Sequence, residues 1–198
     1  MLTSTFLPGF AYHMSVDNMT ELDIRIVRAT PELAQYVDGL RSNYIVNARV
    51  KVSACGDGLD FDVDSVEHPY EKVEDSHPDL AYIGREDAVI FLAFVGDQLV
   101  GQVCAQEDRN HMVRVWELRV EHGHRHRGIA TTLMNTVREW ALARGLHWLR
   151  AETQDIHVTA CMFYRDYGFT IGGIDRLYMC ATPGSEDEIA IAWYLELP

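Results

Sequence analysis

The segment Arg125-His126-Arg127-Gly128-Ile129-Ala130 contains residue types that together could bind a phosphate group. It lies between a strand-like apolar run and a helix-like run, and the first amides of a helix have no partners inside the helix. The helix dipole and the two arginines place positive charge at this end, and Gly128 lets the backbone approach a bulky anion closely. The segment alone predicts a di- or polyphosphate site, but an ordinary turn with surface arginines has the same composition.

Two common nucleotide-binding motifs are incomplete around this segment. Gly123 and Gly128 have the spacing of a Walker loop, but Ile129 and Ala130 stand where that loop needs Lys and then Ser or Thr. The Gly-x-Gly-x-x-Gly pattern of dinucleotide-binding domains is absent from the sequence. An NTPase and an NAD-dependent enzyme are therefore disfavoured.

A second motif lies downstream, in residues 160–169, whose sequence is ACMFYRDYGF. The pattern Arg-x-x-Gly-x-Ala at residues 125–130 resembles the acetyl-CoA loop of the GNAT acetyltransferase superfamily, and residues 160–169 resemble its AxxFYxxxGF helix. The two motifs have the order and separation found in that superfamily. The resemblance covers roughly residues 88–197, and more weakly residues 22–50. It implies a GNAT fold, acetyl-CoA as co-substrate and no metal.

Three further segments narrow the resemblance. Residues 152–156, 173–176 and 187–195 are similar to the streptothricin acetyltransferases. This implies transfer of an acetyl group to a primary amine of a small cationic molecule, a streptothricin-like antibiotic, by direct attack in a ternary complex. The alternatives are a GNAT enzyme that acetylates a protein lysine or N-terminal amine, and a non-catalytic CoA-binding module. The presence of both Glu117 and Tyr164 argues against the binding module.

The resemblance assigns catalytic roles to Tyr164 and Glu117. Tyr164 is expected to act as a general acid that protonates the CoA thiolate. Glu117 is expected to take a proton from the amine, directly or through water, and anchoring of the substrate ammonium group is its alternative role. If Trp116 and Leu118 exclude water from Glu117, its pKa should rise. A backbone amide within residues 118–120 is expected to stabilise the oxyanion.

Further residues are expected to bind the two substrates. The predicted acetyl-CoA contacts are Leu118, Arg119, Val120, Arg125, His126, Arg127, Gly128, Ile129, Ala130, His157, Ala160 and Phe163. The predicted acceptor contacts are Trp116, Glu152, Asp175, Asp187 and Glu188. For Asp187 and Glu188 a solvated turn is the alternative. His157 stands where the superfamily usually has an asparagine that helps to hold the pantetheine arm, and histidine can also donate and accept hydrogen bonds.

Two patterns of side-chain spacing resemble metal sites, and both are disfavoured. His122, His124 and His126 alternate, so they could share one strand face and bind zinc, but the resemblance places them in the phosphate loop. The acidic residues from Asp60 to Asp64 loosely imitate a calcium loop. Ser65 stands where that loop needs glycine. A solvated acidic surface is the preferred interpretation.

The composition limits the partners and the compartment. The chain has 198 residues, 30 of them acidic and 17 basic, and a formal net charge of −13. Nucleic acid is therefore a poor partner, whereas a cationic small molecule or basic peptide fits, and the acidity also serves solubility.

The four cysteines form no CxxC pair, and Cys104 and Cys161 fall in apolar patterns, which favours a reducing cytoplasm. Neither a signal peptide nor a membrane-spanning run is expected. A homodimer is compatible with the sequence, which does not define the oligomeric state.

The elements that must position these residues follow from hydrophobic periodicity. Residues 22–29 alternate as a strand does, a helix is expected from Pro31 through Leu40, and residues 56–79 read as an exposed loop or short helix. Beyond them, the pattern predicts strands at 88–95, 98–106, 111–120, 147–152, 169–173 and 189–195, and helices at 128–144 and 158–167. The predicted fold class is α/β: a GNAT fold with one mixed sheet of six to seven strands, flanked by helices. We expect an N-terminal arm at residues 1–20 and one domain at 21–198.

Overall fold

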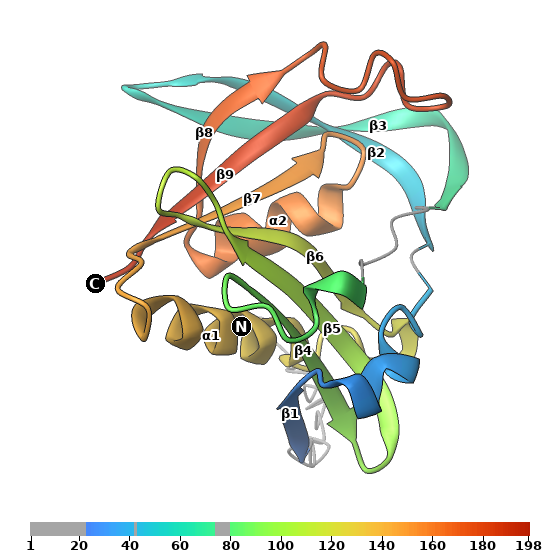
Figure 1. Cartoon of the computed structure of the whole chain (residues 1–198). Coiled ribbons are helices and arrows are strands. Elements are labelled where there is room, and N and C mark those ends of the chain that lie inside the picture. Colours follow the sequence, from blue (N-terminus) through green and yellow to red (C-terminus); the bar gives the residue numbers. More distant parts are fainter. Residues whose placement is uncertain (1–22, 42, 74–79) are drawn as a thin grey trace, which may run out of the picture.

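The structure, a computed structural model, describes residues 23–41, 43–73 and 80–198. Seven strands form one sheet in the order β1-β4-β5-β6-β7-β9-β8 (Figure 1), with β6 and β7 parallel and every other neighbouring pair antiparallel. The strands are β1 (Ile24–Arg28), β4 (Ala88–Val95), β5 (Gln98–Glu107), β6 (Val113–Val120), β7 (Trp148–Gln154), β8 (Thr170–Asp175) and β9 (Ala190–Glu196). The predicted α/β class and mixed sheet are confirmed. The predicted arm at residues 1–20 lies outside the described residues.

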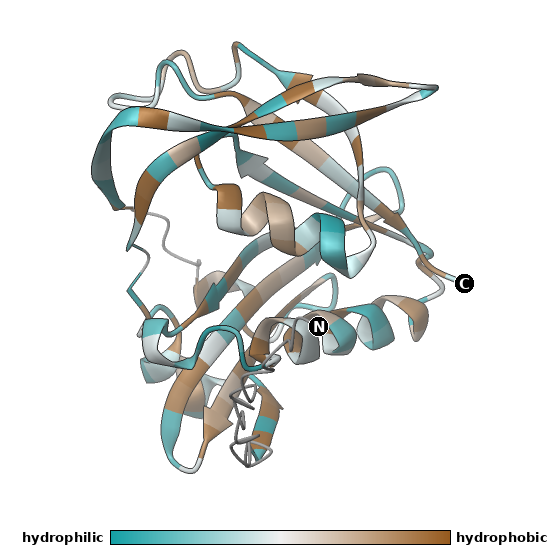
Figure 2. Ribbon diagram, turned by 180° about the vertical axis from the view of Figure 1, so that it is seen from behind, coloured by the Kyte–Doolittle hydropathy of each residue, from teal (hydrophilic) through white to brown (hydrophobic). Residues whose placement is uncertain are grey.

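The sheet is covered on both faces, which explains the unbroken apolar sequence of β4. Alternate residues from Val89 to Ala93 belong to a large core that includes side chains of both α-helices. The intervening residues from Ile90 to Phe94 belong to a smaller core on the opposite face, since successive side chains of a strand alternate. Figure 2 shows the central strands as largely hydrophobic.

The two α-helices begin next to the predicted site and agree with the predicted helices, except that α1 ends at Leu142. α1 (Ile129–Leu142) follows β6 and α2 (Val158–Tyr167) follows β7, so the helices predicted at 128–144 and 158–167 are confirmed. Gly128 and Gly168 adopt left-handed φ angles of 79° and 111° at their ends, a conformation that costs glycine little. α1 faces the large core with Ile129, Leu133, Met134, Val137 and Ala141. No helix in the described ranges is long and apolar enough to cross a membrane.

A β-bulge in the β5–β6 ladder changes which residues of β6 face the large core. Odd-numbered residues face it before Trp116 and even-numbered residues face it afterwards. The neighbours of Trp116 in the chain, Val115 and Glu117, pair with the consecutive residues Ala105 and Cys104. Trp116 is the inserted residue, and an insertion of this kind bends and twists its strand.

β6 and β7 separate just after this bulge. Their parallel pairing joins Val113–Val115 to Leu149–Ala151 and does not extend to the carboxyl ends of the two strands. Both helices start beyond these ends, since α1 follows β6 and α2 follows β7. The separation therefore opens the sheet at the place where two helix N-termini are presented.

Residues 43–73 form a second sheet, which corrects two predictions: the loop or short helix at 56–79, and a fold with one sheet. β2 (Asn43–Cys55) and β3 (Gly58–Val73) make an antiparallel hairpin that lies across the β8–β9 end of the main sheet (Figure 1). Val50 and Phe61 of this hairpin are buried in the large core. Residues 59–64 alternate apolar side chains with aspartates, but the high acidity of the segment favours a loop in the sequence. Residues 74–79 of the predicted loop lie outside the described ranges.

The helix predicted from Pro31 through Leu40 is also corrected. The structure has a short 3-10 helix, η1 (Pro31–Tyr36), and Val37 is already extended. Asp38 adopts a left-handed φ of 67°, and its backbone N–H donates to Gln102 Oε1 at 3.1 Å. The chain leaves the helix early because this hydrogen bond to β5 replaces one inside the helix.

Candidate active site

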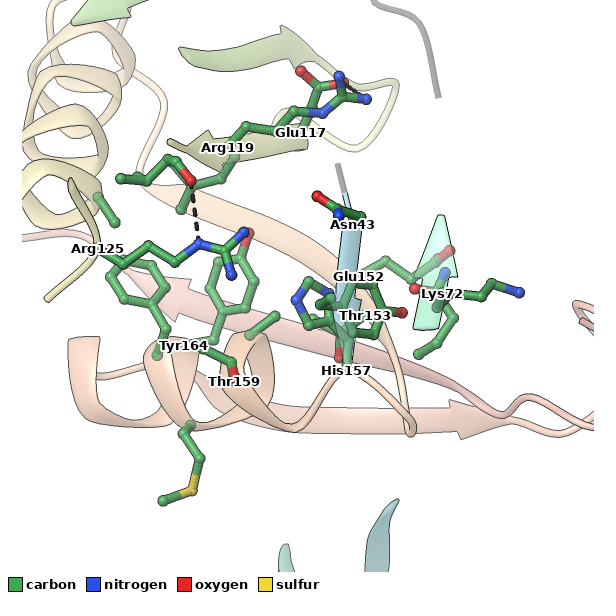
Figure 3. Close-up of a pocket in the computed structure, with 18 of the residues that line it drawn as sticks. Asn43, Lys72, Glu117, Arg119, Arg125, Glu152, Thr153, His157, Thr159 and Tyr164 are labelled. Atoms are coloured by element: carbon green, nitrogen blue, oxygen red, sulfur yellow. Dashed lines mark hydrogen bonds and ion pairs between the residues drawn. The ribbon is translucent and has the colours of Figure 1, made fainter. Parts of the chain in front are cut away.

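A cavity of about 820 Å³ lies between the diverging ends of β6 and β7 (Figure 3). Its walls come from β6, the turn before α1, the first turns of α1 and α2, the first residues of β2, the end of β3 and the loop before β9. In Figure 3, Glu117 and Arg119 approach from β6, Tyr164 and Thr159 from α2, and Asn43 and Lys72 from the hairpin. The cavity is thus assembled from segments that are far apart in the sequence.

The α1 end of the cavity has the features of an anion site. The first bond of the α1 ladder joins the Thr132 N–H to the Gly128 carbonyl at 2.9 Å, so the amides of residues 129–131 precede it. A Cβ at Gly128 would meet open space, so the backbone there is accessible. Arg125 lines the same end, and its Nε donates to the Val120 carbonyl at 3.2 Å (Figure 3).

The residues predicted for the site converge to a large degree. The cavity is lined by Trp116, Glu117, Leu118, Arg119, Val120, Arg125, His126, Gly128, Ile129, Ala130, Glu152, His157, Ala160, Phe163, Tyr164 and Glu188. Arg127, Asp175 and Asp187 do not line it. Arg127 is exposed, and Asp175 Oδ1 accepts from the backbone N–H groups of Leu177 and Tyr178. The structure gives Asp175 the role of a turn former.

The histidines do not share a strand face. His122 and His124 lie in a 3-10 turn, η3 (His122–His124), and His124 Nδ1 is 3.0 Å from Glu121 Oε2. The acidic run from Asp60 to Asp64 lies in strand β3, not in a calcium loop. Within the described ranges, no group of three or more potential metal ligands is found. The spacing of the histidines therefore reflects a loop between β6 and α1.

Tyr164 is a buried residue whose hydroxyl faces the cavity. Its ring packs against Phe169 and Trp193, with ring centroids 5.1 Å and 6.2 Å away. Its hydroxyl makes no hydrogen bond with the described residues, and the residue lines the cavity. Burial raises the pKa of Tyr164 well above its usual range, because the phenolate would lose its hydration. Tyr164 therefore carries its proton at neutral pH.

Glu117 belongs to a polar network on the opposite wall. Gln102 Nε2 donates to Glu117 Oε1 at 2.6 Å, and Arg119 Nη2 lies 3.0 Å from Glu117 Oε2. Arg119 Nη1 in turn lies 2.8 Å from Asp38 Oδ1 and donates to the Leu40 carbonyl. The network holds Glu117 in one orientation. Trp116, which was expected to shield Glu117 from water, is 49% exposed because it is the bulge residue.

Two other predicted acceptor contacts already have cationic partners within the chain. Glu152 Oε2 lies 3.4 Å from Arg150 Nη2 and 4.0 Å from Arg114 Nη2. Glu188 is buried, and Lys72 Nζ lies 2.5 Å from its Oε1. The charge of both carboxylates is therefore partly balanced by the protein.

The contribution of the β2–β3 hairpin was not predicted from the sequence. Asn43, Tyr44, Lys72 and Val73 all line the cavity, and the Tyr44 ring stacks on His157 with centroids 4.0 Å apart and planes within 6°. The alternation of Val50 and Val52 with polar residues is a period-two signal that would have indicated a strand here. The stacking gives His157 a packing partner at the start of α2.

Comparison with known proteins agrees with this geometry. Residues 60–169 match the model of the acetyltransferase (GNAT) family. A streptothricin acetyltransferase of Escherichia coli is 32% identical over 163 residues, which cover 82% of this chain and 90% of that protein. The family model thus includes β6, both α-helices and most of β3.

Two solved structures share the architecture. A streptothricin acetyltransferase structure from Bacillus anthracis, in complex with acetyl coenzyme A, superposes with a TM-score of 0.82 at 27% identity, covering 88% of this chain and 99% of that one. A nourseothricin acetyltransferase structure gives a TM-score of 0.74 at 26% identity with the same coverage of both chains. The whole length of both proteins is therefore represented in this fold.

Proposed function

The chain belongs to the GNAT family of acetyltransferases, and on that premise we propose that it acetylates a primary amine of a small cationic molecule of the streptothricin type. The observation that carries the proposal is the cavity between β6 and β7, which has an anion site at one end and places Glu117 and Tyr164 on opposite walls. The similarity to proteins named streptothricin and nourseothricin acetyltransferases supports this acceptor class. Acetylation of such an antibiotic would confer resistance.

The cavity residues fit acetyl-CoA, which supplies an acetyl thioester when bound. The amides of residues 129–131 and the Arg125 guanidinium provide positive charge and donors for the pyrophosphate. Gly128 keeps the approach to these amides open. Leu118, Val120 and Phe163 also line the cavity and would offer apolar surface to the pantetheine arm.

Tyr164 is proposed as the general acid. When the amine attacks, the thiolate leaves and must gain a proton. The Tyr164 hydroxyl is protonated at neutral pH and faces the cavity without a hydrogen-bond partner among the described residues. These two properties are what a proton donor in this position needs.

Glu117 is proposed to act on the acceptor amine. An alkylammonium group has to lose a proton before its nitrogen can attack, and a carboxylate close to it can accept that proton directly or through water. The hydrogen bond from Gln102 and the ion pair with Arg119 fix the direction of the carboxylate. This fixed orientation suits the role of base and equally that of an ammonium anchor.

Release of CoA thiol tests the function directly. The protein is incubated with acetyl-CoA and a panel of amines: streptothricin, free lysine, aminoglycosides and lysine-containing peptides. We expect acceptor-dependent thiol release with streptothricin, and a product whose mass is increased by one acetyl group. Turnover with peptides alone would favour the protein-acetylating alternative, and acetyl-CoA binding without turnover on any amine would favour the binding module.

The assembly and the compartment stay predictions. The structure contains a single chain, so the homodimer is tested by sedimentation or light scattering. A cytoplasmic location is proposed from the free cysteines, two of which, Cys104 and Cys161, are buried as thiols.

A further inference from the structure

The end of β3 is fastened to the loop before β9 by one side chain. Lys72 Nζ lies 2.5 Å from Glu188 Oε1, and it donates to Ser185 Oγ at 2.7 Å and to the Gly184 carbonyl at 3.1 Å. These three partners satisfy all three hydrogens of an ammonium group. Lys72 is 19% exposed and Glu188 is 6% exposed at the side chain. We call this arrangement the Lys72 clip.

The clip joins the end of β3 to the loop before β9, and the described residues of these two segments form no β-ladder with each other. The hairpin pairs only with itself, in a sheet separate from the main one, and Lys72, Ser185 and Glu188 all line the cavity. In Figure 3, Lys72 and Asn43 lie on the far side of the cavity from Tyr164 and Arg125. The clip therefore shapes the part of the cavity that is distant from the anion site, where an acceptor would enter.

A second set of contacts fastens the hairpin at a different place. Arg49 Nε lies 3.2 Å from Asp155 Oδ2, Arg49 Nη2 donates to the Asp187 carbonyl at 2.9 Å, and the Val50 N–H donates to the Asp155 carbonyl at 2.7 Å. These contacts join the middle of β2 to the turn between β7 and α2 and, through the Asp187 carbonyl, to the loop before β9. Because they hold the hairpin near its middle, loss of the clip would release the end of β3 from this loop without releasing the whole hairpin.

The clip changes the role expected for Glu188. A buried carboxylate needs a cationic or hydrogen-bonding partner, and Lys72 already provides one. If Glu188 were the anchor for the acceptor ammonium, Lys72 would compete with the substrate. If the Lys72–Glu188 pair instead shapes the wall of the cavity, Lys72 would favour binding of the acceptor. The two roles predict effects of opposite sign when Lys72 is removed.

We propose that Lys72 is a specificity-determining residue, which neutralises Glu188 and ties β3 to residues 184–188 so that the acceptor wall of the cavity has a defined shape. The inference rests on the proposed amine acetylation and extends it to the acceptor subsite. It assigns to the Lys72–Glu188 pair a positioning role, and it leaves acetyl-CoA binding to the α1 end of the cavity.

The test compares Lys72→Met, Glu188→Gln and the double variant by steady-state kinetics with streptothricin as acceptor. We expect each single variant to raise the acceptor KM by roughly tenfold or more, with the acetyl-CoA KM within about twofold of wild type. The double variant should be no worse than the worse single variant, because both changes remove one interaction. Lys51→Met is the matched control: Lys51 is an exposed lysine on the same hairpin, and its replacement should leave both KM values unchanged.

Several outcomes would overturn the inference. A lower or unchanged acceptor KM in Lys72→Met, combined with a raised KM in Glu188→Gln, would make Glu188 the substrate anchor. Equal losses for both substrates would indicate general damage to the fold. If Lys72→Met does not fold, Ser185→Ala replaces it, since it removes one of the three partners and should raise the acceptor KM alone by a smaller factor. An unchanged acceptor KM in Ser185→Ala would also overturn the clip.

The experiment separates this inference from the proposed function. If the wild-type protein acetylates no amine in the panel, the function fails, and the clip is then tested by hydrogen exchange. Lys72→Met should speed amide exchange in residues 70–73 and 184–188 but not in residues 129–131. Unchanged exchange in the first two segments would overturn the clip without reference to turnover.

Discussion

Tyr164 combines two properties that rarely occur together in one side chain. Its ring is packed among Phe169, Trp193 and Cys161 in the large core, while its hydroxyl faces the cavity. The packing limits the ring to one position, and burial keeps the phenol protonated. A proton donor with a fixed position and a raised pKa suits the protonation of a thiolate, which is a weak base in water but is poorly solvated in a cavity.

Removal of this hydroxyl should slow catalysis with little change in binding. Tyr164→Phe keeps the ring contacts, so we expect kcat to fall by about 10²-fold or more while the acetyl-CoA Kd stays within about twofold. Because the pKa of Tyr164 lies above the usual value of about 10, its ionisation should cause no fall in wild-type kcat between pH of about 7 and about 10. Steady-state kinetics across this range and calorimetric titration with acetyl-CoA measure both effects.

The control for Tyr164→Phe is Tyr167→Phe on the same helix. The Tyr167 hydroxyl donates to Asn135 Oδ1 at 2.8 Å, outside the main cavity. This variant should retain near wild-type kcat. An equal loss in both variants, or none in Tyr164→Phe, would remove the general-acid role.

At the residue scale, the sequence predicted which residues line the cavity better than it predicted distant partners. Tyr164 and most residues of the loop from Arg125 to Ala130 line the cavity as predicted, because each motif is contiguous and adjoins its own helix. The partner of Glu188 could not be predicted, since Lys72 is more than half the chain away. The loop was expected to use Arg125 and Arg127 alike, but only Arg125 lines the cavity.

At the scale of elements, the contact between β5 and α1 sets the position of the anion site. A Cβ added at Gly101 would lie 2.8 Å from Ile129 Cγ2, 3.0 Å from Leu133 Cδ1 and 3.3 Å from Ala93 Cβ. Gly101 thus allows α1 to approach the sheet closely. Since Ile129 is the first residue of α1, any shift of the helix here also moves the amides proposed to bind phosphate.

Gly101→Ala should therefore weaken stability and acetyl-CoA binding together. Overpacking of a tight core costs about 1–3 kcal/mol, so we expect a loss of this size in the free energy of unfolding, measured by urea denaturation, and a higher acetyl-CoA Kd. Gly173→Ala in β8 is the matched control, because a Cβ there meets no atom within 4 Å. If Gly101→Ala proves as stable as Gly173→Ala, the close approach does not constrain α1.

The β2–β3 hairpin was not predicted because its sequence is rich in acidic residues. Residues 59–64 alternate apolar side chains with aspartates, which is a period-two pattern, but Phe61 is the one buried residue of β3 and its acidic side chains are exposed. The high charge therefore favoured a loop over a strand. In β6 the residues that face the large core switch from odd-numbered to even-numbered positions. The sequence already showed this switch, because apolar residues stand at 113 and 115 and then at 118 and 120. This pattern is typical of a β-bulge, and the bulge accompanies the opening of the cavity.

At the scale of the whole molecule, charge and fold act on the two substrates in different ways. The chain carries a net charge of −13, which attracts a cationic acceptor and repels the anionic acetyl-CoA over distances longer than any single contact. Arg125, which lines the α1 end of the cavity, acts against that field only at short range. The proposed acetyl-CoA site is therefore a local attraction inside a molecule that would repel acetyl-CoA at a distance.

This opposition predicts different salt dependences for the two substrates. Salt screens charges beyond a Debye length of about 8 Å at physiological ionic strength. As ionic strength rises from about 20 mM to about 300 mM, kcat/KM for a cationic acceptor should fall, because steering is lost. Over the same range kcat/KM for acetyl-CoA should fall less or rise, because long-range repulsion is screened as well as the local attraction.

Initial rates with each substrate varied in turn measure the two slopes. A streptothricin-type acceptor with fewer amino groups is the control and should show a shallower slope, whereas equal slopes for acceptor and acetyl-CoA would mean that the net charge serves solubility and not substrate capture.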